Sequence, residues 1–284
     1  MRKRRRGGFF WLLVLALLVY ALVYSNTKVV LREYDVSSPD LPSAFSGMRV
    51  AVIADTHGRF DTDIIDLCEG ADLIVLAGDI IDDASQVTAA ADFAKKLADR
   101  APTYYVTGNH EWATGEAVYS FLDALRSRGV YVMGGKTAAL ERGEASITVA
   151  GLDDPNGRAD LLTTPEALLA GTQAEDFVLL ISHRPYDYDE YAALGADLIV
   201  SGHIHGGLIR LSFLGRLIGH GHGGLIGPGK DFLPELDGGT YPAANGATLV
   251  VSRGLAGVKL NNTSFHWMRL FNPREVVMIT LTKG

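Results

Sequence analysis

The sequence contains a single cysteine, which excludes a disulfide within the chain. This residue, Cys68, follows Ile64 and Leu67 at a spacing typical of the buried face of a short helix. We therefore predict a packed thiol without a chemical role.

Positive charge is scarce beyond the first 27 positions. That segment holds five Lys or Arg and no acid, which leaves 21 bases against 33 acids, a net charge of −12, in the remainder. A body of this charge argues against a nucleic-acid partner. The 284 residues, 48% of them hydrophobic, are enough for one substantial core but short for two independent enzymatic domains.

The longest hydrophobic run lies near the amino terminus, from Phe9 to Tyr24, behind the basic start MRKRRRGG. As a helix it spans about 24 Å, slightly short of a ~30 Å hydrocarbon core, and residues 25–27 can extend it. A signal peptide has the same basic and apolar parts, but residues 22–25 match a cleavage site poorly. We predict an uncleaved, single-pass anchor of the cell membrane over residues 1–27. Because the basic residues precede it, the body is expected on the extracytoplasmic side.

A polar stretch over residues 28–47 predicts a linker to one domain at 48–284. The domain contains five apolar runs that each lead into Asp, Asn or His. With these polar ends, the runs cover residues 48–55, 73–79, 103–110, 177–183 and 198–205. Runs that are apolar throughout are typical of strands buried on both faces.

Helical patterns at 87–100 and 117–129 alternate with these strands and predict β-α-β units. Further strands are expected at 146–154, 247–254 and 275–281, with fewer helices between them. Two sheets packed face to face, with helices outside, accommodate both halves of the domain. Residues 206–245 are rich in glycine and are predicted to form mostly loop.

The polar residues at the strand ends have the types that bind divalent metals. In open α/β sheets, ligands gather at the carboxyl ends of the strands, so we expect these side chains to converge on one rim. Carboxylate, imidazole and amide oxygen suit manganese, iron or zinc. The predicted metal ligands are Asp55, His57, Asp79, Asn109, His183, His203 and His205.

The motifs around these residues resemble those of the calcineurin-like metallophosphoesterases. They are D-x-H at 55–57, GD-x-x-D at 78–82, GNHE at 108–111, a strand-end histidine at 183 and GH-x-H at 202–205. The resemblance implies a four-layer αββα sandwich of two mixed sheets flanked by helices, with residues 48–284 as the metallophosphoesterase domain. It also implies that Asp55, His57 and His205 hold one metal. Asn109, His183 and His203 would hold the other, and Asp79 would bridge the two.

Later segments resemble more narrowly the membrane-associated bacterial phosphodiesterases of this superfamily. These segments are GHIHGG at 202–207, DGGTY at 237–241, SRGLAG at 252–257 and the terminal RLFNPREVVMITL. Leu208 departs from the polar residue expected after GHIHGG. A second GHGHGG, at 219–224, follows no apolar strand and is predicted to be a rim loop.

Two cations in such a site can share a hydroxide, lower its pKa and hold phosphoryl oxygens for in-line attack. A bridging ligand should be a carboxylate, which favours Asp79, whereas the neutral Asn109 suits a terminal position. His110 would point elsewhere on an extended chain. We predict that it donates to a phosphate oxygen or to the leaving group, with Asp82 orienting its imidazole.

The leading hypothesis is a membrane-anchored, metal-dependent phosphodiesterase acting on a phosphate ester, with a lipid-linked ester as one option. A phosphomonoesterase, a non-enzymatic scaffold and a nuclease are the alternatives. The complete ligand set argues against a scaffold, and the net charge of −12 argues against a nuclease. Asp153 and Asp154 are predicted to end a strand, while Arg59 and Arg184 adjoin ligand segments and could meet phosphate.

Overall fold

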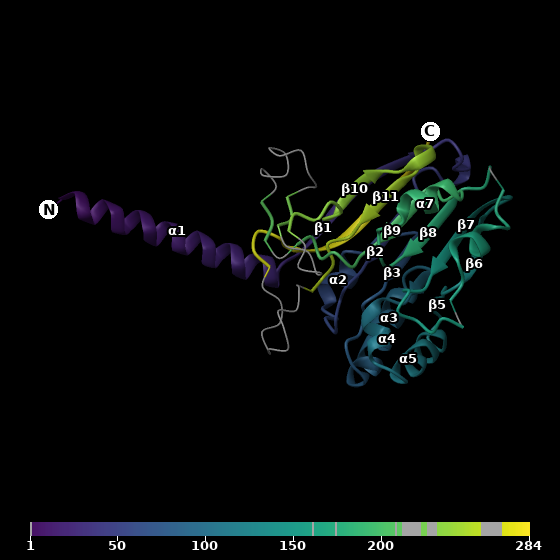
Figure 1. Cartoon of the computed structure of the whole chain (residues 1–284), viewed down its shortest axis with the longest axis horizontal. Helices are drawn as coiled ribbons and strands as arrows, with labels where there is room; N and C mark the ends of the chain where they lie inside the picture. Colours follow the sequence, from purple (N-terminus) through teal and green to yellow (C-terminus); the bar gives the residue numbers. More distant parts are fainter. Residues whose placement is uncertain are drawn as a thin grey trace.

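Two six-stranded sheets form the centre of the protein (Figure 1). The computed structural model describes all residues except 1, 161, 174, 208, 212–222, 226–231 and 257–268. In order across the first sheet the strands are β1 (Val29–Ser38), β12 (Arg274–Lys283), β2 (Arg49–Ile53), β3 (Leu73–Ala77), β4 (Thr103–Val106) and β5 (Tyr131–Val132). Across the second sheet they are β10 (Gly239–Pro242), β11 (Thr248–Val251), β9 (Leu198–Ser201), β8 (Val178–Ser182), β7 (Ala145–Leu152) and β6 (Lys136–Arg142).

Helices cover the outer face of each sheet. Against the first sheet pack α2 (Thr62–Asp66), α3 (Val87–Ala98) and α5 (Ala117–Arg126), with α4 (Asn109–Ala113) beside α5. Against the second sheet pack α6 (Pro165–Leu169) and α7 (Tyr188–Ala193). Short 3-10 turns lie at Ser43–Phe45, Ala84–Gln86 and Ala244–Gly246. The four-layer αββα prediction is confirmed.

Burial on both faces explains the apolar strands. In β2, Val50 and Val52 face the second sheet, whereas Ala51 and Ile53 face the helices. The five predicted strand segments and the two predicted helices are present. The later strands at 146–154, 247–254 and 275–281 are present as β7, β11 and β12. Within 206–245, β10 is an addition to the expected loop, and the GHGHGG prediction at 219–222 and Leu208 fall outside the described residues.

The prediction of a linker over residues 28–47 is wrong for its first half. Strand β1 pairs in parallel with β12 along its whole length, from Val29 opposite Arg274 to Ser38 opposite Lys283. It is an edge strand with only part of its surface buried, so its sequence VVLREYDVSS lacks a continuous apolar run. The chain therefore enters the first sheet directly after the amino-terminal helix.

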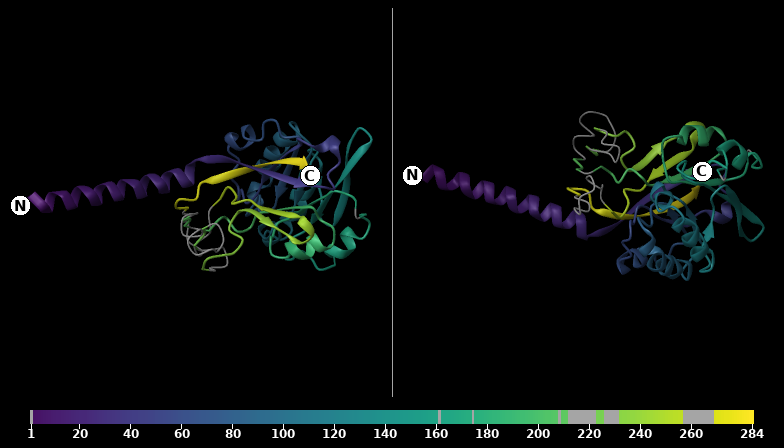
Figure 2. Two further views of the ribbon diagram at one scale, coloured as in Figure 1. Left: turned by 90° about the horizontal axis from the view of Figure 1, so that it is seen from above. Right: turned by 60° about the horizontal axis from the view of Figure 1, so that its bottom comes forward.

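That helix, α1 (Arg2–Thr27), projects away from the sheets, as both views of Figure 2 show. Its segment Gly8–Thr27 is long and apolar enough to cross a membrane. Most of its described side chains are exposed, but Ala21 and Ser25, one turn apart, are buried where α1 meets the body. The last turn of α1 is therefore packed into the protein.

Cys68 is packed as the sequence predicts. Its side chain is buried, its Sγ lies 3.3 Å from the carbonyl oxygen of Ile64, and burial raises the pKa of the thiol to about 12. Because the thiolate is the reactive form, we expect no reaction of the native protein with Ellman's reagent at pH 8 and one thiol per chain after unfolding in guanidinium. A full equivalent of thiol in the native protein would contradict this burial.

Candidate metal centre

The predicted ligands meet at the carboxyl edge of the two sheets. Strands β2 and β3 run parallel in one sheet and β8 and β9 in the other, so the residues that follow them lie at one rim. Potential ligand atoms within 4.8 Å of one another form three groups. The groups are Asp55, His57 and His205; His57, Asp79 and His110; and Asp79, His183 and His203.

Asp79 lies between the outer groups. Its Oδ2 is 3.8 Å from Nε2 of His57 and 3.2 Å from Nε2 of His183. Its other oxygen, Oδ1, accepts the backbone N–H of His110 at 2.8 Å. One carboxylate thus reaches both halves of the rim.

The backbone at the rim is left-handed at five of the predicted ligands. The φ angles are 53° at Asp55, 46° at His57, 54° at Asp79, 72° at His203 and 55° at His205. Each such residue costs on the order of 1–2 kcal/mol, and strain of this kind is found where function requires it. The chain around residues 55–57 is therefore a strained turn, which aims both side chains inward.

The motif glycines allow the backbone to approach the ligands closely. A Cβ on Gly108 would lie 2.2 Å from Oδ1 of Asp79, and one on Gly202 would lie 2.8 Å from Oδ2 of Asp55. No side chain fits at either position without displacing a carboxylate. The lack of room for a Cβ therefore explains why glycine precedes the ligand in the GN and GH dipeptides.

Hydrogen bonds fix the orientation of the histidine rings. Nδ1 of His183 lies 2.8 Å from the carbonyl oxygen of Ala77, and Nδ1 of His205 lies 3.1 Å from that of Ala256. Because a carbonyl oxygen can only accept, each Nδ1 is the donor and Nε2 points to the centre. This is the usual arrangement behind a metal-binding histidine.

Charge and burial at the rim fit a divalent cation. Burial lowers the pKa of His203 to about 3, which keeps this imidazole neutral and able to bind a metal. At His183 burial acts in the same direction, but the charge of Asp79 outweighs it and raises the pKa to about 10. A cation in place of that proton would satisfy the same carboxylate.

The amide oxygen of Asn109 gives a further test of whether a cation fits this site. Within the described part of the chain, this Oδ1 is buried and has no hydrogen-bond partner. An amide oxygen can only accept hydrogen bonds, so burying it unpaired costs about 1–3 kcal/mol. A bound cation would remove that cost, and the donor set therefore fits the metal that the sequence predicts.

Asp82 contacts two imidazoles. Its Oδ1 lies 2.6 Å from Nδ1 of His110 and 2.7 Å from Nδ1 of His57. Burial would raise the pKa of Asp82, but the hydrogen bonds from His110 and His57 outweigh it and lower that pKa. Burial likewise opposes the charged form of His110, and the bond to Asp82 reverses this, so the pKa of His110 is raised. Asp82 thus favours a protonated His110.

The position of His110 differs from the sequence prediction in one respect. Residues Asn109–Ala113 form helix α4 rather than an extended chain. His110 is in its first turn and is partly exposed, and so is Asn109, although the amide oxygen of Asn109 is buried. The chain therefore turns into a helix at the first of these two neighbours.

Sequence reasoning missed Glu111, which is fully buried behind the rim. Its Oε2 accepts the N–H groups of Asp79 at 2.9 Å and Gly108 at 2.7 Å. Its Oε1 accepts those of Ile80 at 2.5 Å and Ile81 at 3.1 Å. One carboxylate thus holds the turn that carries Asp79, and the last letter of GNHE was the available signal.

The remaining charged candidates lie around the rim. Arg184 forms an ion pair with Asp154, with Nε 2.6 Å from Oδ2, and Asp153 accepts from the Thr107 hydroxyl at 2.7 Å. Both aspartates therefore bind other side chains, in addition to following the end of β7. Arg59 is half-buried, and burial lowers its pKa.

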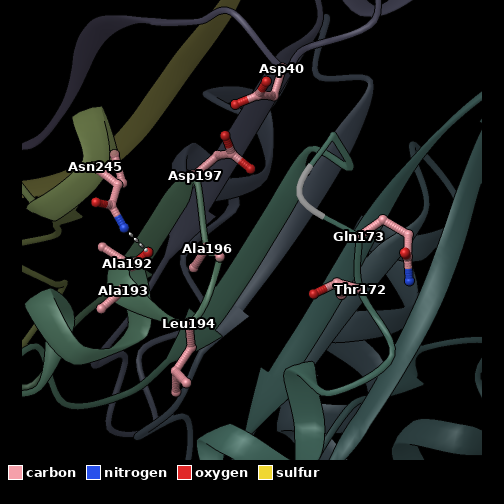
Figure 3. Close-up of a pocket in the computed structure, with 11 residues that line it drawn as sticks. Asp40, Thr172, Gln173, Ala192, Ala193, Leu194, Ala196, Asp197 and Asn245 are labelled. Carbon is pink, nitrogen blue, oxygen red and sulfur yellow. Dashed lines mark hydrogen bonds between the residues drawn. The ribbon is translucent and has the colours of Figure 1, made fainter.

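A separate pocket of about 340 Å³ lies at the opposite edge of the second sheet (Figure 3). It borders Asp197, which precedes β9, whereas the predicted ligands follow β9. Asp197 accepts the N–H of Val178 at 2.8 Å and the hydroxyl of Ser38 at 3.0 Å. The carboxylate therefore joins β1 to β8 and has a structural use.

Comparison with known proteins agrees with the geometry of the rim. Residues 48–207 match the family described as Calcineurin-like phosphoesterase. A transmembrane protein with metallophosphoesterase domain from Danio rerio is 28% identical over 239 residues, covering 75% of this chain and 54% of the relative. The metallophosphoesterase YkuE of Bacillus subtilis is 30% identical over 213 residues, covering 70% of this chain and 72% of YkuE. The phosphodiesterase YaeI of Escherichia coli is 26% identical over 179 residues, covering 59% of this chain and 64% of YaeI. The chain spans about half the length of the Danio rerio relative.

Proposed function

The chain belongs to the calcineurin-like phosphoesterase family, and from this premise we propose that it is a membrane-anchored phosphodiesterase with a dinuclear metal centre. Its class, a hydrolase acting on phosphoester bonds, follows from the family. The observation that carries the dinuclear proposal is the position of Asp79 between His57 and His183. A single carboxylate with ligands on both sides suits a bridge between two cations.

The ligands divide into two sets around Asp79. Asp55, His57 and His205 would hold one cation. Asn109, His183 and His203 would hold the other. When bound, two divalent ions would acidify a water molecule and neutralise charge on the phosphoryl oxygens. Manganese, iron and zinc all suit these ligands.

His110 and Asp82 would serve the leaving group. The bond to Asp82 orients the imidazole of His110 and favours its protonated form, from which it can donate a proton to the departing oxygen or a hydrogen bond to a phosphoryl oxygen. Asp82 would act through His110 and would not itself contact substrate.

We expect His110→Ala to lower kcat by about 10²-fold, the lower end of what general acid–base catalysis contributes. Metal content, measured by elemental analysis of the purified protein, should stay near that of the parent protein. His110 also lies within one potential ligand group. Equal loss of metal and activity would therefore assign it to the metal and contradict a role as proton donor.

Several observations support the finer parts of the proposal. The relative YaeI is named a phosphodiesterase, which favours a diester over a monoester. The apolar helix α1, together with a relative named as a transmembrane protein, supports an anchor in the cell membrane. The five basic residues ahead of the apolar run favour an extracytoplasmic body, and an ester carried by a lipid would be accessible there.

The test is a substrate screen with the full-length protein in detergent, loaded with manganese, iron or zinc in turn. Bis(p-nitrophenyl) phosphate should be hydrolysed faster than p-nitrophenyl phosphate. Faster hydrolysis of the monoester would favour a phosphomonoesterase, and no hydrolysis of either ester with any metal would favour a non-enzymatic scaffold. Protease digestion of intact cells tests the orientation, since protection of the body would contradict an extracytoplasmic site.

A further inference from the structure

The amino-terminal helix joins the body at the edge that carries the metal centre. Strand β1 is parallel to β12, and β12 is antiparallel to β2, so β1 begins at the edge where β2 ends. In the register of the sheet, Val29 lies opposite Arg274 and Val52 lies opposite Val277. Arg274 is therefore level with Asp55, three residues beyond Val52. The end of α1 and the first metal ligand are at the same height in the sheet.

Hydrogen bonds fix the last turn of α1 to the segment before β12. The side chain of Asn26 donates to the carbonyl of Arg269 at 2.8 Å and accepts its N–H at 3.1 Å. The hydroxyl of Ser25 accepts the N–H of Asn272 at 3.2 Å, and Arg274 donates to the carbonyl of Thr27 at 2.6 Å. Since Ser25, Arg269 and Asn272 are buried, the attachment is rigid.

The same segment supports the ligand-bearing loop. The side chain of Asn272 donates to the carbonyls of His205 at 2.8 Å and Gly207 at 2.7 Å. Asn272 thus binds α1 through its backbone and the His205 loop through its amide. A single buried residue therefore connects the helix to the loop that carries His205.

Two exposed phenylalanines lie in the segments next to this junction. Outside α1, the described residues with large exposed hydrophobic side chains are Tyr131, Tyr186, Phe232 and Phe271. Phe271 directly precedes Asn272. Phe232 is 74% exposed, and backbone hydrogen bonds connect its segment, through two others, to the segment that carries Phe271. Those bonds run from Leu233 to Leu225, from Leu225 to Ile209 and from Arg210 to Leu270. Exposed phenylalanine side chains are among those that bury into the headgroup boundary of a bilayer when a protein lies against it.

We infer that the metal-binding edge lies against the surface of the bilayer that holds α1, and that the substrate is an amphiphilic phosphoester whose phosphate lies at headgroup level. This inference rests on the proposed function and on α1 as the anchor. A linker over 28–47 would let the site face any direction, but a rigid junction fixes one edge towards the lipid. The turn at Gly143, before β7, then faces away from the membrane.

Fluorescence quenching by brominated lipids tests the orientation without any measurement of activity. In a Cys68→Ala background, Phe271→Cys, Phe232→Cys and Glu144→Cys of the full-length protein are labelled with bimane and reconstituted in phosphatidylcholine vesicles. Labels at 271 and 232 should be quenched, and the label at Glu144, in the exposed turn on the opposite edge, should not. Absence of quenching at both aromatic positions, or equal quenching at Glu144, would overturn the inference.

A kinetic experiment tests the substrate class. Eight Gly and Ser residues inserted between Thr27 and Lys28, together with Asn26→Ala, should free the body from α1. Hydrolysis of a vesicle-embedded nitrophenyl phosphodiester lipid should then fall by about 10-fold or more, because the site is still tethered to the vesicle but is no longer held facing its surface. Hydrolysis of soluble bis(p-nitrophenyl) phosphate should change less than about twofold, and the same insertion after Gly143 should affect neither ester.

The two experiments separate the inference from the proposed function. If the insertion at Thr27 leaves hydrolysis of the lipid ester unchanged, the inference of an amphiphilic substrate is wrong. The proposed phosphodiesterase function would still hold, with a soluble ester as the substrate. If no variant, including the parent protein, hydrolyses either ester, the proposed function fails, and the quenching pattern still decides whether the metal-binding edge faces the bilayer.

Discussion

Replacing Asp79 by asparagine is expected to leave the protein folded and to remove metal and activity together. Asparagine has the same shape, tolerates the left-handed φ of 54°, and can still accept the N–H of His110 through its amide oxygen. It cannot supply a charged oxygen between His57 and His183. Since the metals would provide the acidified water, we expect kcat/KM to fall by about 10⁴-fold or more.

Elemental analysis and circular dichroism distinguish this result from misfolding. Asp63→Asn, at an exposed position of α2, makes the same chemical change away from the rim and should keep both metal content and activity. Retention of the parent protein's metal content by the Asp79→Asn protein would contradict the proposed bridging position. A loss of helical signal would instead assign Asp79 a role in folding the turn.

The sequence predicts which residues gather at the rim because two patterns can be read in it separately. Buried strands appear as apolar runs, and candidate metal ligands appear as the polar residues that follow them. Strands such as β3 and β8 are buried on both faces, so they are apolar until the chain leaves the sheet. A polar residue directly after such a run, like Asp79 or His183, must lie at the edge. The sheet then brings these residues together, although the metal each would hold stays a prediction.

The junction between α1 and the sheet could not be predicted in the same way. Strand β1 is defined by pairing with β12, whose residues are more than 240 positions away in the sequence. As an edge strand with exposed positions at Arg32 and Glu33, it lacks the apolar pattern on which prediction depends. Local sequence therefore indicated a linker where a non-local partner makes a strand.

Helix α4 and the strained turns were also beyond local prediction. α4 has only five residues, too few to be stable alone. It begins at Asn109 because Glu111 accepts the N–H of Gly108 and then reaches the turn after β3. Bonds between two distant segments determine the conformation, and neither segment signals it separately.

Glu111→Gln is expected to have the largest effect on stability, because this carboxylate holds both of those segments. Each oxygen accepts two backbone N–H groups. In the variant, one oxygen becomes an NH₂ group that faces two buried donors, at about 1–3 kcal/mol for each donor left unpaired. We expect a loss of about 2–6 kcal/mol in the free energy of unfolding, measured in urea.

Metal affinity should weaken with the same substitution, although Glu111 is not one of the predicted metal ligands. Residues that support metal ligands are typically worth about 10- to 100-fold in affinity, and Glu111 binds the backbone N–H of Asp79 itself. Glu116→Gln, exposed five residues along the chain, removes the same charge and should change neither quantity. If Glu111→Gln unfolds at the same urea concentration as Glu116→Gln, the carboxylate does not hold the turn. If it is destabilised but binds metal as tightly as the parent protein, the turn carrying Asp79 is held by the metals rather than by Glu111.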